Sequence, residues 1–200
     1  FFENTRKPVG LGGKIMVAMM NFGHSAMAAW GLHFLQPAPD AMVLDYGCGG
    51  GANIKTLLKL CPKGKVQGID YSAVSVEKAR KVNAGAIAAG RCTVQQASVA
   101  ELPFGTEQFE VVTAFETVYF WPELVQNFRE VYRVLKPGGI FFICNEANGE
   151  TTKDDKWTQI INGMTIYTDA DLKVYLEQAG FGRVQRHKNK KGWLCVTAQK

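Results

Sequence analysis

Four glycines interrupt the sequence directly after a short apolar run, at Gly47 and at 49–51. Glycine adopts left-handed backbone conformations and, lacking a side chain, lets a ligand approach the main chain. The residues from Ala52 onward have a helical pattern, and the free N–H groups at a helix N-terminus can bind a ligand. The segment therefore predicts a ligand-binding loop, although the spacing Gly47-x-Gly49-x-x-Ala52 alone is a weak signal.

Two acids make the prediction more specific. Asp70 follows Gly47 by 23 residues, at the end of the next apolar run. A carboxylate at this position can accept hydrogen bonds from both hydroxyls of a ribose. Asp45 lies two residues before Gly47. A loop that binds a pyrophosphate gains nothing from this second carboxylate, whereas a loop that binds an ammonium or sulfonium group does. The structural alternatives are a strand-end turn for Asp70 and a loop cap for Asp45.

The elements that position these groups alternate between strands and helices. This order predicts a right-handed, mostly parallel α/β sheet with helices on both faces. The last two strands flank a short polar turn, so we expect a hairpin in which one strand runs antiparallel to the rest. The expected strands are 42–45, 66–70, 92–97, 109–115, 140–144, 181–187 and 193–198, and the expected helices are 52–60, 73–89, 122–135 and 168–179.

Two segments stand outside this alternation. Residues 10–35 suggest two short helices broken near 21–23, and we expect 1–39 to form a helical cover over the substrate. Residues 148–167 are too many for an ordinary connection, which indicates an insertion near the active face. The remaining chain, 40–200, is predicted to be one ligand-binding domain.

The composition is that of an ordinary globular protein. In 200 residues, 46% are hydrophobic and 20% charged, which excludes a disordered or collagen-like chain. The net charge of +5 permits an anionic partner without requiring one. Five widely spaced cysteines without a CxxC pair argue against a disulfide framework and a zinc site, and we expect no metal. Free thiols suggest a cytoplasmic protein.

The N-terminal region gives no sign of a secretory or membrane-spanning segment. Phe1–Pro8 is charged, unlike a signal peptide. Polar residues and glycines interrupt the apolar stretch Met16–Leu35, so a membrane span is not expected. Because the sequence does not begin with Met, we expect it to start inside a longer chain.

Several short segments, in a fixed order over residues 40–199, resemble the class I S-adenosylmethionine-dependent methyltransferases, especially the small-molecule branch similar to the ubiquinone/menaquinone methyltransferases. The resemblance implies a Rossmann-like seven-stranded fold and S-adenosylmethionine as cofactor, with S-adenosylhomocysteine as product. The segments are 43–51 (VLDYGCGGG), 66–72 (VQGIDYS), 101–104 (ELPF), 109–112 (FEVV), 132–139 (YRVLKPGG) and 177–181 (EQAGF).

The resemblance also implies roles for individual residues. Asp45 would organise the ammonium end of the cofactor and Asp70 its ribose, with Tyr71 beside the adenine. Two departures stand out: Ser98 replaces a commonly acidic adenine ligand, and Glu110 replaces a commoner Asp. The predicted cofactor-binding residues are Asp45, Gly47, Cys48, Gly49, Asp70, Tyr71, Ser72, Ser98, Val99 and Phe115.

The catalytic candidates follow the fourth strand or belong to the N-terminal segment. Glu116 is a candidate base or substrate-orienting acid, Tyr119 a candidate pocket wall, and His24 a candidate base because its pKa range suits proton transfer. A loop ion pair, core packing and a surface histidine are the respective structural alternatives. Asn145 and Glu146 are expected at the same edge, and Arg6, Lys7 and Lys14 are candidates to reach the methionine carboxylate.

A small-molecule methyl acceptor is the favoured substrate. The segment after the fourth strand lacks the Asn/Asp-Pro-Pro-aromatic motif of enzymes that methylate exocyclic base amines, and no RNA-binding platform is present, so no nucleic-acid partner is expected. Two alternatives remain open. One is a non-catalytic cofactor-binding or interaction module; the other is an NAD(P)-dependent oxidoreductase, which the extra acid Asp45 and the terminal hairpin disfavour.

Overall fold

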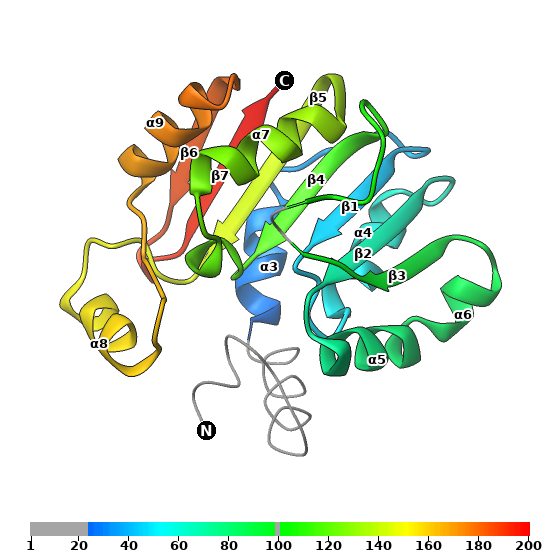
Figure 1. Ribbon diagram of the computed structural model, residues 1–200, viewed down its shortest axis with the longest axis horizontal. Helices are drawn as coiled ribbons and strands as arrows, with labels where there is room; N and C mark the ends of the chain where they lie inside the picture. Colours follow the sequence, from blue (N-terminus) through cyan, green and yellow to red (C-terminus); the bar gives the residue numbers. More distant parts are fainter. Residues whose placement is uncertain (1–23, 99–100) are drawn as a thin grey trace.

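The computed structural model describes residues 24–98 and 101–200, and it has a central sheet between two layers of helices (Figure 1). The strands are β1 (Met42–Tyr46), β2 (Lys65–Asp70), β3 (Cys92–Gln96), β4 (Phe109–Phe115), β5 (Leu135–Asn145), β6 (Gly182–Lys188) and β7 (Leu194–Gln199). The helices are α3 (Ser25–Leu32), α4 (Ala52–Leu60), α5 (Ala73–Val82), α6 (Ala84–Ala88), α7 (Leu124–Val134), α8 (Thr152–Ile160) and α9 (Asp169–Gln178), with a 3-10 turn η1 (Val118–Phe120).

The sheet has the predicted mixed topology. Its strand order is β3-β2-β1-β4-β5-β7-β6, with seven strands. The pairs among β1 to β5 are parallel, whereas β7 runs antiparallel to both β5 and β6. The carboxyl ends of β1, β2, β4 and β5 therefore meet at one edge, where open α/β sheets bind their ligands. The α/β fold with a C-terminal antiparallel hairpin is confirmed.

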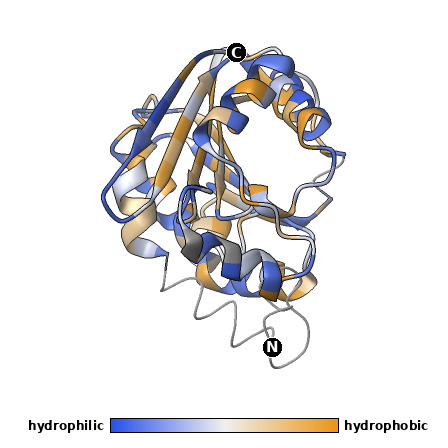
Figure 2. Cartoon of the chain, turned by 90° about the vertical axis from the view of Figure 1, so that its left-hand side faces the viewer, coloured by the Kyte–Doolittle hydropathy of each residue, from blue (hydrophilic) through white to orange (hydrophobic). Residues whose placement is uncertain are grey.

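The two faces of the sheet hold separate apolar cores because successive side chains of a strand point to opposite faces. Leu44 and Phe141 belong to the core beneath α7 and α9, whereas their neighbours Val43 and Phe142 belong to the core beneath α3, α4 and α5. Figure 2 shows the mostly apolar strands lying between these helices. The prediction of helices on both faces is confirmed.

One predicted helix is interrupted. The pattern over 73–89 predicts a single helix, but α5 ends at Val82 and the short α6 begins at Ala84. The buried amide of Asn83 donates to the carbonyls of Gly51 and Ala79, at 2.9 and 3.0 Å. A residue in contact with the glycine loop thus stands at the break, which helical periodicity could not reveal.

The boundaries around β5 also differ from the prediction. Helix α7 begins at Leu124 rather than at Pro122, and η1 precedes it. Strand β5 begins at Leu135, so Lys136–Gly139 lies within the strand instead of separating it from the helix. Leu135 pairs with Phe109, and a register shift follows between Phe109 and Val111. This long-range pairing extends the strand beyond the apolar run 140–144.

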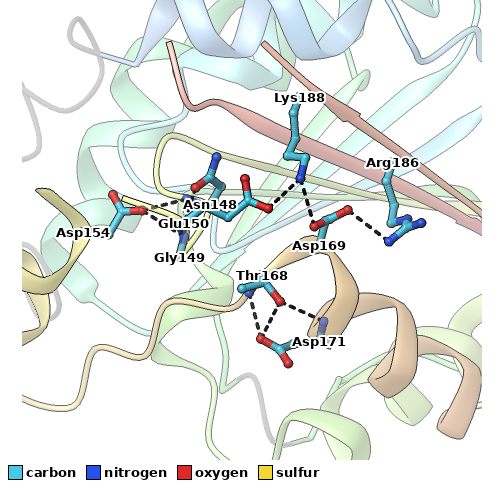
Figure 3. Close-up of polar contacts among 9 residues, drawn as sticks. All are labelled: Asn148, Gly149, Glu150, Asp154, Thr168, Asp169, Asp171, Arg186 and Lys188. Carbon is cyan, nitrogen blue, oxygen red and sulfur yellow. Dashed lines mark hydrogen bonds and ion pairs between the residues drawn. The ribbon is translucent and has the colours of Figure 1, made fainter. Parts of the chain in front are cut away.

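The segment between β5 and α9 contains helix α8, and a polar network ties its two ends together (Figure 3). Lys188 of β6 donates to Glu150 at 2.7 Å and to Asp169 at 3.3 Å. Asp154 accepts the backbone N–H of Gly149 at 2.9 Å. A Thr168–Asp171 capping box opens α9. Both ends of the segment are therefore anchored beside β6, and α8 extends beyond the sheet (Figure 1).

The cysteines are free thiols, as expected from their spacing. Cys48, Cys61, Cys92, Cys144 and Cys195 are all buried and unbridged. Within the described ranges, no helix is both long and apolar enough to cross a membrane.

Candidate functional site

The glycine loop joins the end of β1 to the start of α4. The backbone N–H groups of Gly47 and Cys48 both donate to the carbonyl of Ile69 in β2, at 2.9 Å each. Gly47 has a φ of +78° and Gly49 a φ of +51°, in the left-handed region that favours glycine. Among the residues that the structure describes, a Cβ at Gly49 would meet no atom within 4 Å apart from its own chain neighbours, so the loop borders open space in this part of the structure.

Asp70 fixes this loop from the end of β2. Its Oδ2 accepts the N–H of Gly49 at 3.0 Å, and its Oδ1 accepts the N–H of Ser72 at 2.8 Å. Burial raises the pKa of Asp70, against the two backbone hydrogen bonds, which lower it. The Ser75 side chain is a third hydrogen-bond partner of this carboxylate, so one of its roughly four acceptor positions remains for a further donor.

Asp45 is buried at the end of β1 with one oxygen satisfied and one not. Its Oδ1 accepts the hydroxyl of Thr113 at 2.8 Å, whereas its Oδ2 is buried without a hydrogen-bond partner among the described residues. Burial raises the pKa of Asp45 to about 7, and the charge of Asp70 adds to that rise. A buried carboxylate with an unpaired oxygen is suited to a cationic ligand group.

The other predicted cofactor residues lie around the same edge of the sheet. Tyr71 is 37% exposed, which leaves its ring accessible. Phe115, at the end of β4, is buried with its ring centroid 5.3 Å from that of Phe142. Ser98 is exposed beyond β3. Val99 lies outside the described residues, as do Arg6, Lys7 and Lys14.

Glu116 directly follows β4 and has a left-handed φ of +57°. Its Oε1 accepts the Tyr119 hydroxyl at 3.1 Å and the backbone N–H of Glu146. Burial raises the pKa of Glu116 to about 7, although His24 and both hydrogen bonds favour its ionised form. The Tyr119 hydroxyl also accepts the N–H of Ala147 at 3.0 Å, which links the loops that follow β4 and β5.

His24, just before α3, comes next to these groups. Its Nδ1 lies 3.7 Å from Oε2 of Glu116 and 3.5 Å from Oε1 of Glu146. Burial lowers the pKa of the imidazole, but the two carboxylates outweigh it and raise the pKa above 6.5. One nitrogen of His24 and one carboxylate oxygen each of Glu116 and Glu146 lie within 4.8 Å of one another. These three atoms are close enough to share one proton or one cation. The absence of a metal stays a prediction.

Comparison with known proteins identifies the family. Residues 44–143, half of the chain, match the family described as a methyltransferase domain. The chain belongs to the methyltransferase domain family. The match begins beside Asp45 and ends within β5, so it includes the glycine loop, Asp70 and Glu116. The family assignment confirms the resemblance to class I methyltransferases of the small-molecule type.

Two methyltransferases are similar in sequence. Cycloartenol-C-24-methyltransferase 1 of Oryza sativa subsp. japonica is 31% identical over 105 residues, or 52% of this chain and 30% of the relative. Demethylmenaquinone methyltransferase of Symbiobacterium thermophilum is 34% identical over 111 residues, or 55% of this chain and 44% of the relative. The matched segments thus span less than half of either relative.

A solved methyltransferase has a similar fold. The structure of Haemonchus contortus phosphoethanolamine N-methyltransferase 2 in complex with S-adenosyl-L-methionine superposes with a TM-score of 0.81 at 13% identity. It covers 100% of this chain and 60% of the other. At this identity the likeness concerns the fold.

Sequence reasoning missed three residues of this candidate site. Thr113 is the partner of Asp45; the register places the two side by side, so a polar residue within an apolar strand was the available signal. Thr117 packs against Gly47, where a Cβ on the glycine would lie 2.9 Å from that of the threonine. Asn83 bonds to the loop through Gly51, and no sequence pattern indicated this.

Proposed function

We propose that this chain binds S-adenosylmethionine and methylates a small-molecule acceptor. The observation that carries the proposal is the arrangement of Asp45, Asp70 and the glycine loop at one edge of the sheet. The site fits the cofactor in two respects. Within residues 24–98 and 101–200, Asp45 keeps a buried oxygen without a hydrogen-bond partner, and Gly49 borders open space. When bound, S-adenosylmethionine supplies an electrophilic methyl group on a sulfonium, which departs as a neutral thioether.

The residues of the chain have distinct proposed roles toward this cofactor. Asp70 accepts a hydrogen bond from the ribose hydroxyls at the acceptor position that its bonds to Gly49, Ser72 and Ser75 leave open. The unpaired oxygen of Asp45 accepts the ammonium group, and the backbone of Gly47–Gly49 lies against the methionine part. Tyr71, Ser72 and Ser98 surround the adenosine, as the resemblance implies for the positions they occupy.

The acceptor side of the site is proposed to lie at the loops that follow β4 and β5. Thr117 packs against Gly47, so its neighbour Glu116 lies close to the glycine loop. Glu116, Tyr119 and His24 form a hydrogen-bonded or charge-paired group there. The names of the two relatives describe methyl transfer to cycloartenol and demethylmenaquinone, both small molecules, which supports an acceptor of that class.

A ligand panel tests this function against the alternatives. Thermal unfolding is measured with S-adenosylmethionine, S-adenosylhomocysteine, NAD⁺ and NADPH at equal concentration. A ligand present at about 100 times its Kd stabilises the folded state by about 2.7 kcal/mol. We expect stabilisation by the first two compounds alone. Stabilisation by a nicotinamide dinucleotide alone would contradict the proposal, as would no response to any of the four.

A further inference from the structure

His24 lies where three separate segments of the chain meet. The residue itself precedes α3, Glu116 follows β4, and Glu146 follows β5. Both carboxylates approach the same ring nitrogen, Nδ1, at 3.5 and 3.7 Å. This nitrogen is buried and makes no hydrogen bond within the described residues. Active-site hydrogen bonds are commonly long before the substrate binds, so these distances suit a pair that tightens in the complex.

The carboxylate of Glu116 is held in one orientation. The Tyr119 hydroxyl and the backbone N–H of Glu146 both donate to its Oε1, so its other oxygen, Oε2, is the one nearest His24. The side chain of Glu116 is only 14% exposed, whereas that of Glu146 is 39% exposed. One carboxylate is thus anchored inside the protein, and the other approaches the ring from the more open side.

The charges around the ring favour a proton on Nδ1. Two carboxylates face this nitrogen, and a protonated Nδ1 is the state that both attract. The titratable groups around it in the described ranges are Glu116 and Glu146, with Tyr119 and Cys144 behind them. When Nδ1 carries the proton of a neutral imidazole, Nε2 holds the free electron pair.

We infer that Glu146 and Glu116 are positioning residues that hold His24 with Nδ1 protonated, so that Nε2 takes a proton from the methyl acceptor. The assignment rests on the proposed function. It also names the acceptor class, because proton removal matters for a hydroxyl or an ammonium group and not for a thiolate. Sequence reasoning had named His24 and Glu116 as separate candidates and had not paired them.

The bond between hydrogen and the acceptor atom breaks, and the proton moves to Nε2, which makes His24 an imidazolium between two carboxylates. The electron pair of that bond stays on the acceptor atom and forms its bond to the methyl carbon. The electrons of the old carbon–sulfur bond remain on sulfur. His24 then releases the proton to solvent, and the neutral imidazole with Nδ1–H returns.

Nitrogen NMR of the histidines tests this inference without an acceptor. The chain contains three histidines, so ¹⁵N-labelled rings can be assigned by substitution. We expect neutral His24 to carry its proton on Nδ1 and to titrate above 6.5. In Glu146→Gln the apparent pKa of His24 falls by roughly one pH unit, because a neighbouring charge is lost. Glu146 is partly exposed, so the variant is expected to fold; Glu116→Gln should shift the pKa in the same direction.

Glu150→Gln is the matched control. Glu150 lies in the same loop but pairs with Lys188, so its substitution should leave His24 unchanged. A neutral His24 protonated on Nε2, or a pKa that does not respond to Glu146→Gln, would overturn the inference. So would binding of one Zn²⁺ per chain that His24→Gln abolishes. S-adenosylhomocysteine binding is measured on the same samples: its absence contradicts the proposed function, whereas normal binding with an unresponsive His24 contradicts this inference alone.

Discussion

Oδ2 of Asp70 lies 3.0 Å from the backbone nitrogen of Gly49, so the acid at the end of β2 directly holds the loop at the end of β1. The other oxygen of Asp70 accepts the N–H of Ser72, which caps α5. One carboxylate therefore positions two segments that border the proposed cofactor site. Its substitution affects the shape of the loop as well as any contact with a ribose.

Alanine at Gly47 and at Gly49 should have different effects. At Gly47 a Cβ would approach that of Thr117 to 2.9 Å in addition to requiring a left-handed φ. We expect a loss of more than about 2 kcal/mol in the free energy of unfolding, from backbone strain and overpacking together. At Gly49 only the strain of a left-handed φ applies, so we expect the free energy of unfolding to fall by about 1–2 kcal/mol. Urea unfolding of the two variants measures both losses.

The same pair of variants reports on the ligand. A Cβ at Gly49 would point into space that holds no atom of the described residues within 4 Å, and we propose that the cofactor lies there. Gly49→Ala should therefore remain folded and bind S-adenosylhomocysteine at least about tenfold more weakly, a difference of about 1.4 kcal/mol. Wild-type affinity in a folded Gly49→Ala protein would place the ligand elsewhere.

Asp45→Asn should stabilise the ligand-free protein at neutral and higher pH. The pKa of Asp45 is raised by burial from 3.8 to about 7, so the folded state holds this proton more tightly than the unfolded state. The resulting stability is present below pH 3.8 and is lost as the pH rises towards 7. The asparagine of the variant does not titrate. The variant's free energy of unfolding should therefore exceed that of wild type by a margin that grows with pH to roughly a few kcal/mol.

Denaturant unfolding from pH 4 to pH 8 measures that advantage. The difference between variant and wild type is the useful quantity, because other titrating groups cancel in it. A difference independent of pH would show that Asp45 does not titrate as described. The same variant should bind S-adenosylhomocysteine more weakly, since the amide cannot pair with an ammonium group as a carboxylate does.

Tyr119→Phe should destabilise the protein more at pH 8 than at pH 5. At either pH the variant leaves the buried N–H of Ala147 without its acceptor, a loss of about 1–3 kcal/mol. At pH 8 Glu116, whose pKa is about 7, is ionised and also loses the hydrogen bond that favours its charged form. Equal destabilisation at the two pH values, measured by urea unfolding, would argue against the Tyr119–Glu116 bond.

Most of the fold could be predicted because it depends on local patterns. Apolar runs and helical periodicity indicated every strand of the sheet and the helices α4, α7 and α9. The errors arose where distant segments interact. Asn83 interrupts the predicted helix while bonding to Gly51, and Leu135 joins β5 early by pairing with Phe109. Neither contact can be predicted from the local sequence pattern.

The candidate site could likewise be predicted only in part. Asp45 and Asp70 could be placed together because the carboxyl ends of parallel strands meet at one edge. The approach of His24 to Glu116 and Glu146 depends on how α3 packs beside the sheet. No spacing in the sequence encodes that packing, so the three residues could be named singly but not as a group.

Calorimetric titration with S-adenosylhomocysteine, on wild type, Asp70→Ala and Asp40→Asn, measures whether this chain binds the cofactor through Asp70 and the glycine loop. Asp40 is an exposed acid outside the site and serves as the control. We expect binding to wild type and Asp40→Asn, with a loss of affinity of at least about tenfold in Asp70→Ala. Circular dichroism verifies that each protein is folded. A folded wild type that does not bind, or equal affinity in Asp70→Ala, would contradict a cofactor site built on Asp70 and the glycine loop.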